Sequence, residues 1–295
     1  DDADVTHGLT IEAHVKKSHR PGIFIDGGEG VGRVTKPGLD QPVGFAAINR
    51  VPRRMIEEQV QQVCDALGYD GGIEIVICIP GGKEAAQKTF NPMLGVEGGL
   101  SILGTSGIVE PMSEQALVDT IAVELRQAAA LGAKRLILTP GNYGEDFLRE
   151  NQMAGDAVPV VKCSNFIGDA LDIASTHPFT EVLLVGHIGK LVKLAGGVMN
   201  THSRYADCRT ELVCAHAAVC GASPETCLAL LQAATTDACI EILDSAQLRG
   251  PVLDSLLEAI QQHLEHRVRG KYRIGAVLFS NQYGLLGQTQ MAKEI

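Results

Sequence analysis

The chain lacks several features that would assign it to common classes of protein. Its 295 residues carry a net charge of −10 and contain no block of Lys and Arg, which argues against a nucleic-acid partner. No apolar run approaches the ~20 residues that a membrane-spanning helix needs. The eight cysteines form no CxxC pair and follow no signal-like segment, as expected for reduced thiols in the cytosol. We therefore expect a soluble cytoplasmic protein with neither nucleic acid nor membrane as a partner.

Short catalytic motifs are also missing. No GxGxxG follows a predicted strand, and "GGKEA" (81–85) lacks the spacing of a phosphate-binding loop. His263 and His266 lie three residues apart without a third ligand nearby, so no metal site is predicted. "GTSG" (104–107) is not a nucleophile elbow, and Cys163 after a strand is read as a buried thiol in preference to a nucleophile. The sequence therefore does not predict a dehydrogenase, a kinase or a triad hydrolase.

The spacing of apolar residues predicts two domains with a boundary at 111/112. Residues 1–111 form an α+β domain, with a helix at 55–67 and short strands at 9–15, 22–25, 73–79 and 100–104. Residues 112–295 alternate strands with helices, which predicts a Rossmann-like α/β domain with a mainly parallel sheet. Its strands are expected at 135–139, 158–162, 181–186 and 274–280. Its helices are expected at 114–131, 145–153, 165–175, 189–196, 204–220, 224–234 (capped by Ser223), 237–246 (capped by Thr236) and 251–268.

Three strands of the second domain end in small polar loops, at 139–145, 162–168 and 185–191. In a parallel sheet such loops share the carboxyl edge, where helix N-termini attract ligands and glycine lets the backbone approach them. The loops are also explained as ordinary connections, because Gly and Asn tolerate positive φ. The predicted cofactor-binding residues are Gly141, Asn142, Gly144, Asn165, Gly186, His187 and Gly189.

Two further segments carry candidate substrate contacts. One is the glycine-rich segment "GGEGVGRVTKPGL" (27–39), which is expected to bring Arg33, Thr35 and Lys36 to an anionic ligand. The alternative is that this segment forms only a pair of tight turns. The segment 189–211 is dense in polar residues, with His202 as a candidate catalytic proton carrier. Its alternative is a solvated helix face with Arg–Glu pairs. Its candidate substrate-binding residues are Lys190, Lys193, Ser203 and Arg204.

Several long segments resemble one known family in order along nearly the whole chain. They are "GGEGVGRVTKPGL" (27–39), "PVGFAAINRVPR" (42–53), "QKTFNPMLGVEGGLSILGTSGIVEPMSE" (87–114), "LTPGNYGE" (138–145), "KCSNFIGDAL" (162–171) and "LVGHIGKLVKLAGGVMNTHSRYAD" (184–207). With them the sequence is similar to the cobalt-precorrin-5B C1-methyltransferase family, CbiD. That family has a further N-terminal Thr- and Gly-rich stretch which this chain lacks before Asp1, so we expect part of the active site to be missing if that stretch contributes to it.

The resemblance implies transfer of a methyl group from S-adenosyl-L-methionine to carbon 1 of cobalt-precorrin-5B, giving cobalt-precorrin-6A in anaerobic cobalamin biosynthesis. Cobalt is then part of the tetrapyrrole substrate, not a cofactor of the protein. The sulfonium donor is already activated, so holding carbon and methyl in line suffices without a strong base. Two alternatives remain open: a non-catalytic corrinoid carrier, and an enzyme with different chemistry on the same intermediate. Self-association and transient contact with other corrin enzymes are both compatible with the sequence.

Overall fold

A computed structural model describes residues 5–89, 91–103, 114–151, 153 and 158–294. The chain is a mixed α/β protein that divides into two compact units, Asp1–Ala116 and Leu117–Ile295. The domain boundary that the sequence suggested at 111/112 stays a prediction, because residues 104–113 lie outside the described part of the chain.

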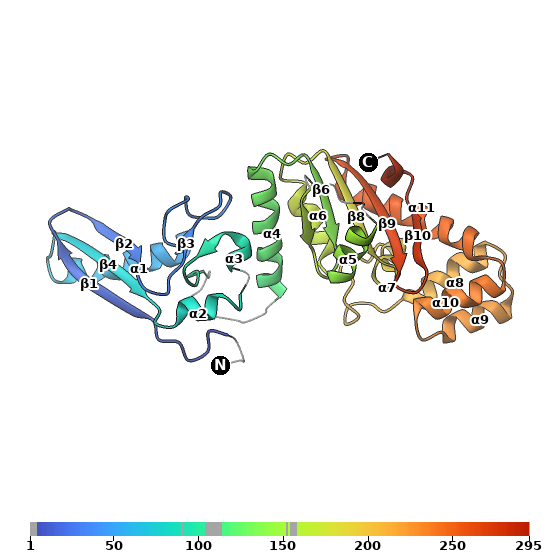
Figure 1. Cartoon of the computed structure of the whole chain (residues 1–295), viewed down its shortest axis with the longest axis horizontal. Helices are drawn as coiled ribbons and strands as arrows, with labels where there is room; N and C mark the ends of the chain where they lie inside the picture. The colour runs from blue at the N-terminus through green and yellow to red at the C-terminus, as the bar shows by residue number, and fades with distance from the viewer. Residues whose placement is uncertain (1–4, 90, 104–113, 152, 154–157, 295) are drawn as a thin grey trace. The chain divides into compact units, whose positions relative to one another are not determined.

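The N-terminal unit is built on a three-stranded sheet with the order β1-β4-β2 (Figure 1). Its strands are β1 (Glu12–Ser18), β2 (Ile23–Gly27) and β4 (Gly72–Cys78). β4 is antiparallel to β1 and parallel to β2. A second, two-stranded ladder joins β3 (Arg33–Val34) to β5 (Val96–Glu97). The helices of this unit are α1 (Arg50–Ala66), α2 (Gly82–Ala86) and α3 (Asn91–Leu94).

Three backbone segments of this unit meet at glycines. Gly30 has a φ of 72°, and a Cβ added there would lie 1.8 Å from the carbonyl oxygen of Ile79. Cβ atoms added at Gly82 and Gly99 would lie 2.5 and 2.3 Å from the carbonyl oxygen of Gly30. We call Gly30, Gly82 and Gly99 the glycine interlock. The close approach that the loop 27–39 permits is therefore, at Gly30, an approach to the protein's own backbone.

The strand expected at 100–104 does not form as such within the described residues. Leu100 and Ile102 make isolated bridges to Val31 and Ile48. Position 104 lies outside the described residues. Leu100 is buried and Ile102 is half-buried, whereas Leu103 is exposed, and the segment makes only these single bridges in place of a continuous ladder.

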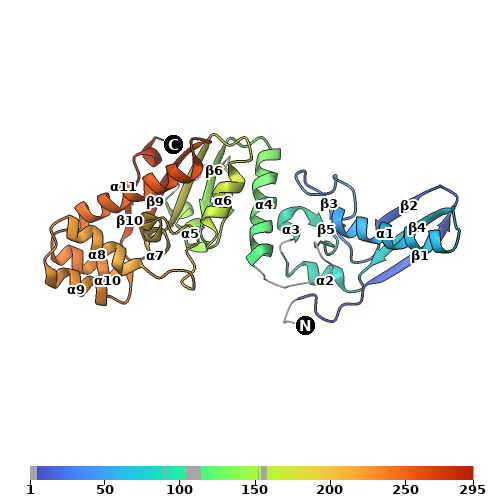
Figure 2. The ribbon, with the colours of Figure 1, turned by 180° about the vertical axis from the view of Figure 1, so that it is seen from behind.

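The C-terminal unit contains a five-stranded sheet with the order β10-β9-β8-β6-β7 (Figures 1 and 2). The strands are β6 (Arg135–Thr139), β7 (Val160–Lys162), β8 (Glu181–His187), β9 (Arg273–Ser280) and β10 (Gly284–Gln288). β7, β6, β8 and β9 run parallel, and only β10 is antiparallel to its neighbour. Both faces are covered, so the strands read as nearly continuous apolar runs.

Alternate residues of these strands enter two separate cores. Leu136 and Leu138 of β6 pack with α4, α6 and α11, whereas Ile137 faces α5. On that second face Phe147 of α5 stacks on Phe279 of β9, with ring centroids 4.3 Å apart. The helices around the sheet are α4 (Glu114–Ala130), α5 (Asn142–Glu150), α6 (Ile167–Ala174) and α11 (Arg249–Val268). The inside-and-outside alternation thus fixes the register of the sheet.

A helical group connects β8 to β9. It starts with the single turn α7 (Ile188–Leu191) and the 3₁₀ helix η1 (Val192–Gly196), and continues with α8 (Arg209–Val219), α9 (Pro224–Gln232) and α10 (Thr236–Ser245). The chain ends with a 3₁₀ turn, η2 (Met291–Lys293). Among the described residues, no helix has both the length and the apolar content needed to cross a membrane.

The expected N-cap of α9 is confirmed, and the expected N-cap of α10 is wrong. Ser223 accepts a hydrogen bond from the backbone N–H of Thr226, 3.2 Å away, ahead of a proline at the first helical position. α10 is capped by Thr235, which accepts from the N–H of Ala238. The next residue, Thr236, is buried at the first helical position. Two adjacent threonines offer the same chemistry, so the sequence did not separate them.

The helix expected at 204–220 begins only at Arg209, and strand β10 was not expected at all. Residues 204–208 belong to a loop that is tied to other parts of the unit. β10 is a short, half-exposed edge strand of Gly and Leu, so it carries little of the alternation that marks a strand.

Candidate ligand-binding site

The sheet has a topological switch point between β6 and β8. From β6 the chain passes through α5 to β7 on one side, and after α6 it returns to β8 on the other side. Ligands of open α/β sheets bind outside the carboxyl ends of the strands at such a point, because the two connections diverge there. The loop after β6 and the loop after β8 are two of the three that the sequence analysis singled out.

Lys190 bridges the two sides of the switch point. Its Nζ donates a hydrogen bond to the carbonyl oxygen of Pro140, 2.8 Å away. The side chain is half-buried, and among the described residues no carboxylate oxygen lies within 4.0 Å of Nζ. Burial lowers the pKa of Lys190, an effect that nearby Cys163 opposes and Lys193 reinforces. A cation here without an acidic partner is suited to an anionic ligand.

His187 ends β8 beside Lys190 and is held in one orientation. Its Nδ1 accepts a hydrogen bond from the backbone N–H of Gly189 at 3.0 Å, so the neutral ring carries its proton on Nε2. The ring meets Phe279 edge to face, with centroids 5.8 Å apart. Burial lowers the pKa of His187, although the charge of Asp237 opposes the shift. His187 is therefore an uncharged donor near neutral pH.

The glycines of these loops differ in what surrounds them. A Cβ at Gly141 would meet no atom of the described residues within 4 Å, so these residues leave the space above it open. Cβ atoms at Gly144 and Gly186 would press against Thr139, 2.8 Å away, and Leu191, 2.9 Å away. Gly144 and Gly186 therefore serve internal packing, whereas Gly141 borders free space. Cofactor binding by the predicted residues, including the exposed Asn142 at the start of α5, stays a prediction.

The loop 197–208 is fixed to the carboxyl edge of β7. The backbone N–H of Thr201 donates to the carbonyl oxygen of Asn165 at 2.9 Å, and the Thr201 hydroxyl donates to Asn165 Oδ1 at 3.3 Å. Lys193 is only 3% exposed, and its Nζ donates to the carbonyl oxygens of Thr201 (3.0 Å) and Ala206 (2.7 Å). Lys193 was predicted to bind the substrate, but its ammonium group donates these hydrogen bonds to the loop and holds it in place.

The tip of this loop is exposed and carries three of the predicted residues. His202 Nδ1 accepts a hydrogen bond from the backbone N–H of Arg204 at 3.1 Å. A neutral ring therefore carries its proton on Nε2, which does not take part in this bond. The guanidinium of Arg204 lies over the ring of Tyr205, 5.0 Å from its centroid. Ser203 between them is exposed. The structure thus joins His202, Ser203 and Arg204 on one tip and ties that loop to Asn165.

The predicted substrate residues of the N-terminal unit lie around the β3–β5 ladder. Both terminal nitrogens of Arg33 donate to the Asp26 carboxylate, at 2.8 and 2.9 Å, so its fork is occupied within the protein. The Thr35 hydroxyl donates to the carbonyl oxygen of Gly95, 3.1 Å away. Lys36 is exposed, with its stem against Gly95. These residues belong to a different unit from Lys190 and His202.

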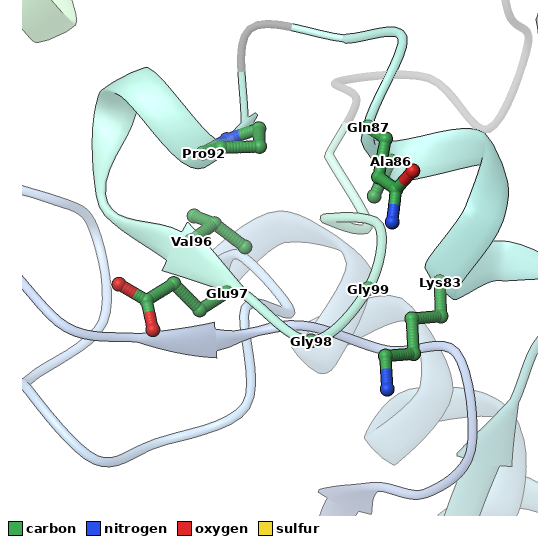
Figure 3. A pocket seen from close by; sticks show the side chains of 8 residues that line it. All are labelled: Lys83, Ala86, Gln87, Pro92, Val96, Glu97, Gly98 and Gly99. Atoms are coloured by element: carbon green, nitrogen blue, oxygen red, sulfur yellow. The ribbon is translucent and has the colours of Figure 1, made fainter.

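A hollow of about 280 Å³ lies beside this ladder (Figure 3). It is lined by Lys83, Ala86, Gln87, Pro92, Val96, Glu97, Gly98 and Gly99. The Thr35 hydroxyl lies 3.4 Å from Glu97 Oε1, which connects a predicted residue to the hollow. Lys83 and Gln87 were not predicted as site residues, because the segment of Lys83, "GGKEA" (81–85), lacks the spacing of a phosphate-binding loop and Gln87 belongs to no recognised motif. The hollow is slightly smaller than the roughly 300–1,000 Å³ of most small-molecule pockets.

Two chemistries that the sequence analysis disfavoured can be compared with the structure. Cys163 is fully buried, and burial raises the pKa of its thiol to about 12, so it is no thiolate nucleophile near neutral pH. The described residues contain no group of three or more His, Cys, Asp or Glu side chains that could hold a metal ion.

The fold defines a class: an α/β protein whose largely parallel sheet carries polar and cationic side chains at the carboxyl edge, around a topological switch point. Comparison with known families gives the particular member of that class. The family described as CbiD matches residues 1–111, and the family described as CbiD, C-terminal domain, matches residues 200–290. The chain belongs to the CbiD family.

Two relatives cover the chain almost completely. A protein of Ruminiclostridium cellulolyticum is 47% identical over 304 residues, which include 100% of this chain and 79% of the relative. A protein of Alkaliphilus metalliredigens is 44% identical over 292 residues, with 99% of this chain and 76% of the relative. Both are named cobalt-precorrin-5B C(1)-methyltransferase. A solved structure, the cobalamin biosynthesis protein (cbiD) from Archaeoglobus fulgidus, is 29% identical, covering 68% of this chain and 61% of that chain with a TM-score of 0.30.

Proposed function

We propose that this chain is a methyltransferase that acts on carbon 1 of cobalt-precorrin-5B. The observation that carries the proposal is 47% identity over the whole chain to a relative named for this reaction. The methyl donor is S-adenosyl-L-methionine, the product is cobalt-precorrin-6A, and cobalt enters only with the tetrapyrrole. The enzyme is cytoplasmic in this proposal. Self-association and contact with other corrin enzymes stay predictions.

The donor is proposed to bind at the switch point of the C-terminal unit, for which we keep the classification as Rossmann-like. The parallel strands β7, β6, β8 and β9 support that classification. The space that the described residues leave open at Gly141 and the half-buried cation of Lys190 support the site. Gly141, Asn142, His187 and Gly189 are the proposed donor contacts. Gly144, Gly186 and Asn165 shape the loops around them.

The substrate is proposed to be held through its carboxylate side chains by exposed donors. His202, Ser203 and Arg204 at the tip of the 197–208 loop are suited to this, because they are exposed and carry hydrogen-bond donors. Thr35 and Lys36 are the proposed contacts in the N-terminal unit. Arg33 and Lys193 leave the proposed set, because Asp26 and the 197–208 loop use their donors.

The proposed chemistry is one nucleophilic displacement. An electron pair of the conjugated ring system attacks the methyl carbon from carbon 1, while the carbon–sulfur bond breaks and its pair stays on sulfur as a thioether. The sulfonium needs no acid and the ring carbon needs no strong base, so the protein contributes mainly alignment. His202, the candidate proton carrier, is in this proposal a hydrogen-bond donor to the substrate through Nε2.

The test is mass spectrometry of cobalt-precorrin-5B incubated with the protein and methyl-labelled S-adenosyl-L-methionine. One labelled methyl group on the ring, placed at carbon 1 by NMR, is the expected result. A pigment that binds but gains no methyl would leave the carrier alternative. A change of mass other than one methyl group would indicate different chemistry on the same intermediate.

A further inference from the structure

The carboxyl edge of β9 carries an acidic group. Ser280 is the last residue of β9, and its hydroxyl donates to Asp237 Oδ1 at 2.8 Å. The same hydroxyl accepts from the backbone N–H of Gln282 at 3.0 Å, which fixes its direction. Asp237 is the second residue of α10, and among the described residues no hydrogen bond is made to its Oδ2. One carboxylate oxygen is therefore held by the protein and the other is available.

Asp237 lies next to the end of β8. His187 pairs with Phe279 in the parallel register, so Ser280 is one residue beyond that pair. The Thr236 hydroxyl lies 3.6 Å from where a Cβ of Gly189 would be, so the start of α10 packs on the loop after β8. The charge of Asp237 also acts on His187. Asp237 thus lies on one side of the loop after β8, and the Nζ of Lys190 lies on the other side.

The two charges occupy opposite sides of the end of β8. Lys190 Nζ is bonded to Pro140 just beyond β6, and Asp237 is bonded to the end of β9. β6 and β9 are the two neighbours of β8, so the charges are about two strand spacings apart, on the order of 10 Å. The four-bond arm of the donor from its carboxylate carbon to its sulfur spans roughly 5 Å. With a contact distance of about 3 Å at each end, the donor would span roughly 11 Å, which is close to the separation of Lys190 and Asp237.

We propose that Lys190 and Asp237 fix the direction of the methyl donor, with the donor carboxylate on Lys190 and the positive sulfonium toward Asp237. The inference rests on the proposed function and deepens it. In this orientation the methyl group lies on the β8–β9 side of the switch point. The carboxylate lies on the β6 side, next to the open space at Gly141.

His187 between the two charges is consistent with this orientation. Burial holds its pKa down, so the ring stays neutral near neutral pH and does not repel a sulfonium. Transfer of the methyl group removes the positive charge from sulfur, and the attraction to Asp237 ends with it. The orientation therefore also favours the donor over its thioether product.

Titration calorimetry with three ligands tests the inference. S-adenosyl-L-methionine has both the carboxylate and the sulfonium, S-adenosyl-L-homocysteine lacks the sulfonium charge, and 5′-methylthioadenosine lacks the amino-acid group as well. Lys190→Met is expected to weaken the first two roughly ten- to a hundredfold and to leave the third unchanged. Lys190→Arg keeps the charge and is expected to retain the preference for the ligands with a carboxylate. Lys162→Met is the control, because Lys162 pairs with Glu145 on the surface at 2.9 Å.

Asp237→Asn keeps an oxygen for Ser280 and removes only the charge. It is expected to reduce the preference for S-adenosyl-L-methionine over S-adenosyl-L-homocysteine about three- to tenfold. Asp244→Asn on the same helix is the control, because Asp244 pairs with Arg249, 3.2 Å away. An unchanged preference in Asp237→Asn would overturn the sulfonium contact. Equal weakening of all three ligands by Lys190→Met would overturn the carboxylate contact.

The failure of this inference can be told from failure of the proposed function. Wild-type protein that binds none of the three ligands and transfers no methyl group refutes both. Wild-type protein that methylates the substrate, with both variants behaving as their controls do, refutes only the orientation. Circular dichroism checks that each variant is folded, and the Asp237→Asn comparison remains decisive if Lys190→Met does not fold.

Discussion

Replacing Lys193 by Met should destabilise the C-terminal unit. Substrate affinity should fall only as far as the 197–208 loop loses its position, because Lys193 itself does not contact the substrate in our assignment. Lys193 is 3% exposed, and its Nζ donates to the carbonyl oxygens of Thr201 and Ala206 at 3.0 and 2.7 Å. Met fills a similar volume but donates nothing. The substitution therefore leaves two acceptors without their shared donor.

The magnitude follows from these two bonds. A hydrogen bond from a charged donor contributes about 1.5–3 kcal/mol, and part of that is regained because the ammonium no longer has to be buried. We expect a net loss of about 3 kcal/mol in the free energy of unfolding. For a unit of this size each kcal/mol corresponds to about 2–4 °C, so the melting temperature should fall by about 6–12 °C.

The assay is thermal and urea unfolding followed by circular dichroism, with Lys162→Met as the matched control. Lys162 makes one half-exposed ion pair with Glu145, so its loss should change stability by less than about 1 kcal/mol. A Lys193→Met protein as stable as wild type, with substrate affinity lost, would refute the assignment. It would restore Lys193 as a substrate-binding cation.

Three further predictions concern single residues. Cys163 should resist iodoacetamide at pH 8 in the folded protein and react after unfolding, measured by peptide mass spectrometry, because its thiol has a pKa of about 12. His187→Gln should reduce the loss of stability below about pH 6.5 in urea titrations. Buried His187 has a lowered pKa, so the unfolded chain takes up its proton first and acid favours unfolding. Gly30→Ala should prevent folding of the N-terminal unit, whereas Gly44→Ala, with a φ of 90° but open space, should cost about 1 kcal/mol; equal stability of the two would contradict the clash with Ile79.

Four of the five strands described in the C-terminal unit could be predicted closely, because buried apolar runs have a clear pattern, whereas the half-exposed edge strand β10 was not predicted. The strand β6 has the predicted bounds, and the carboxyl-edge loops lie where alternation of strands and helices requires. The start of α8 could not be predicted, because what removes residues 204–208 from the helix is a tertiary contact of Lys193. Lys193 has the charge of a typical surface residue, but in the fold it is buried and holds the 197–208 loop.

The sequence placed the candidate loops correctly at the carboxyl edge of the sheet, whereas ligand binding by their residues stays a prediction. The loops after β6 and β8 were singled out from Gly, Asn and Pro, and their residues do adjoin the switch point. Asp237 was not noticed, because it starts a helix about 50 residues after His187 and reaches the sheet only through Ser280. Likewise, the glycines of 27–39 suggested a ligand, although at Gly30 the close partner is Ile79. Spacing along the chain carries no information on such distant partners.

The glycine interlock has a genetic consequence. At Gly30, Gly82 and Gly99 the atom that an added methyl group would strike belongs to the main chain, which no second mutation can shrink. A substitution at any one of the three should therefore have no intragenic suppressor at the other two. In a selection for function, revertants of such alleles should restore glycine itself.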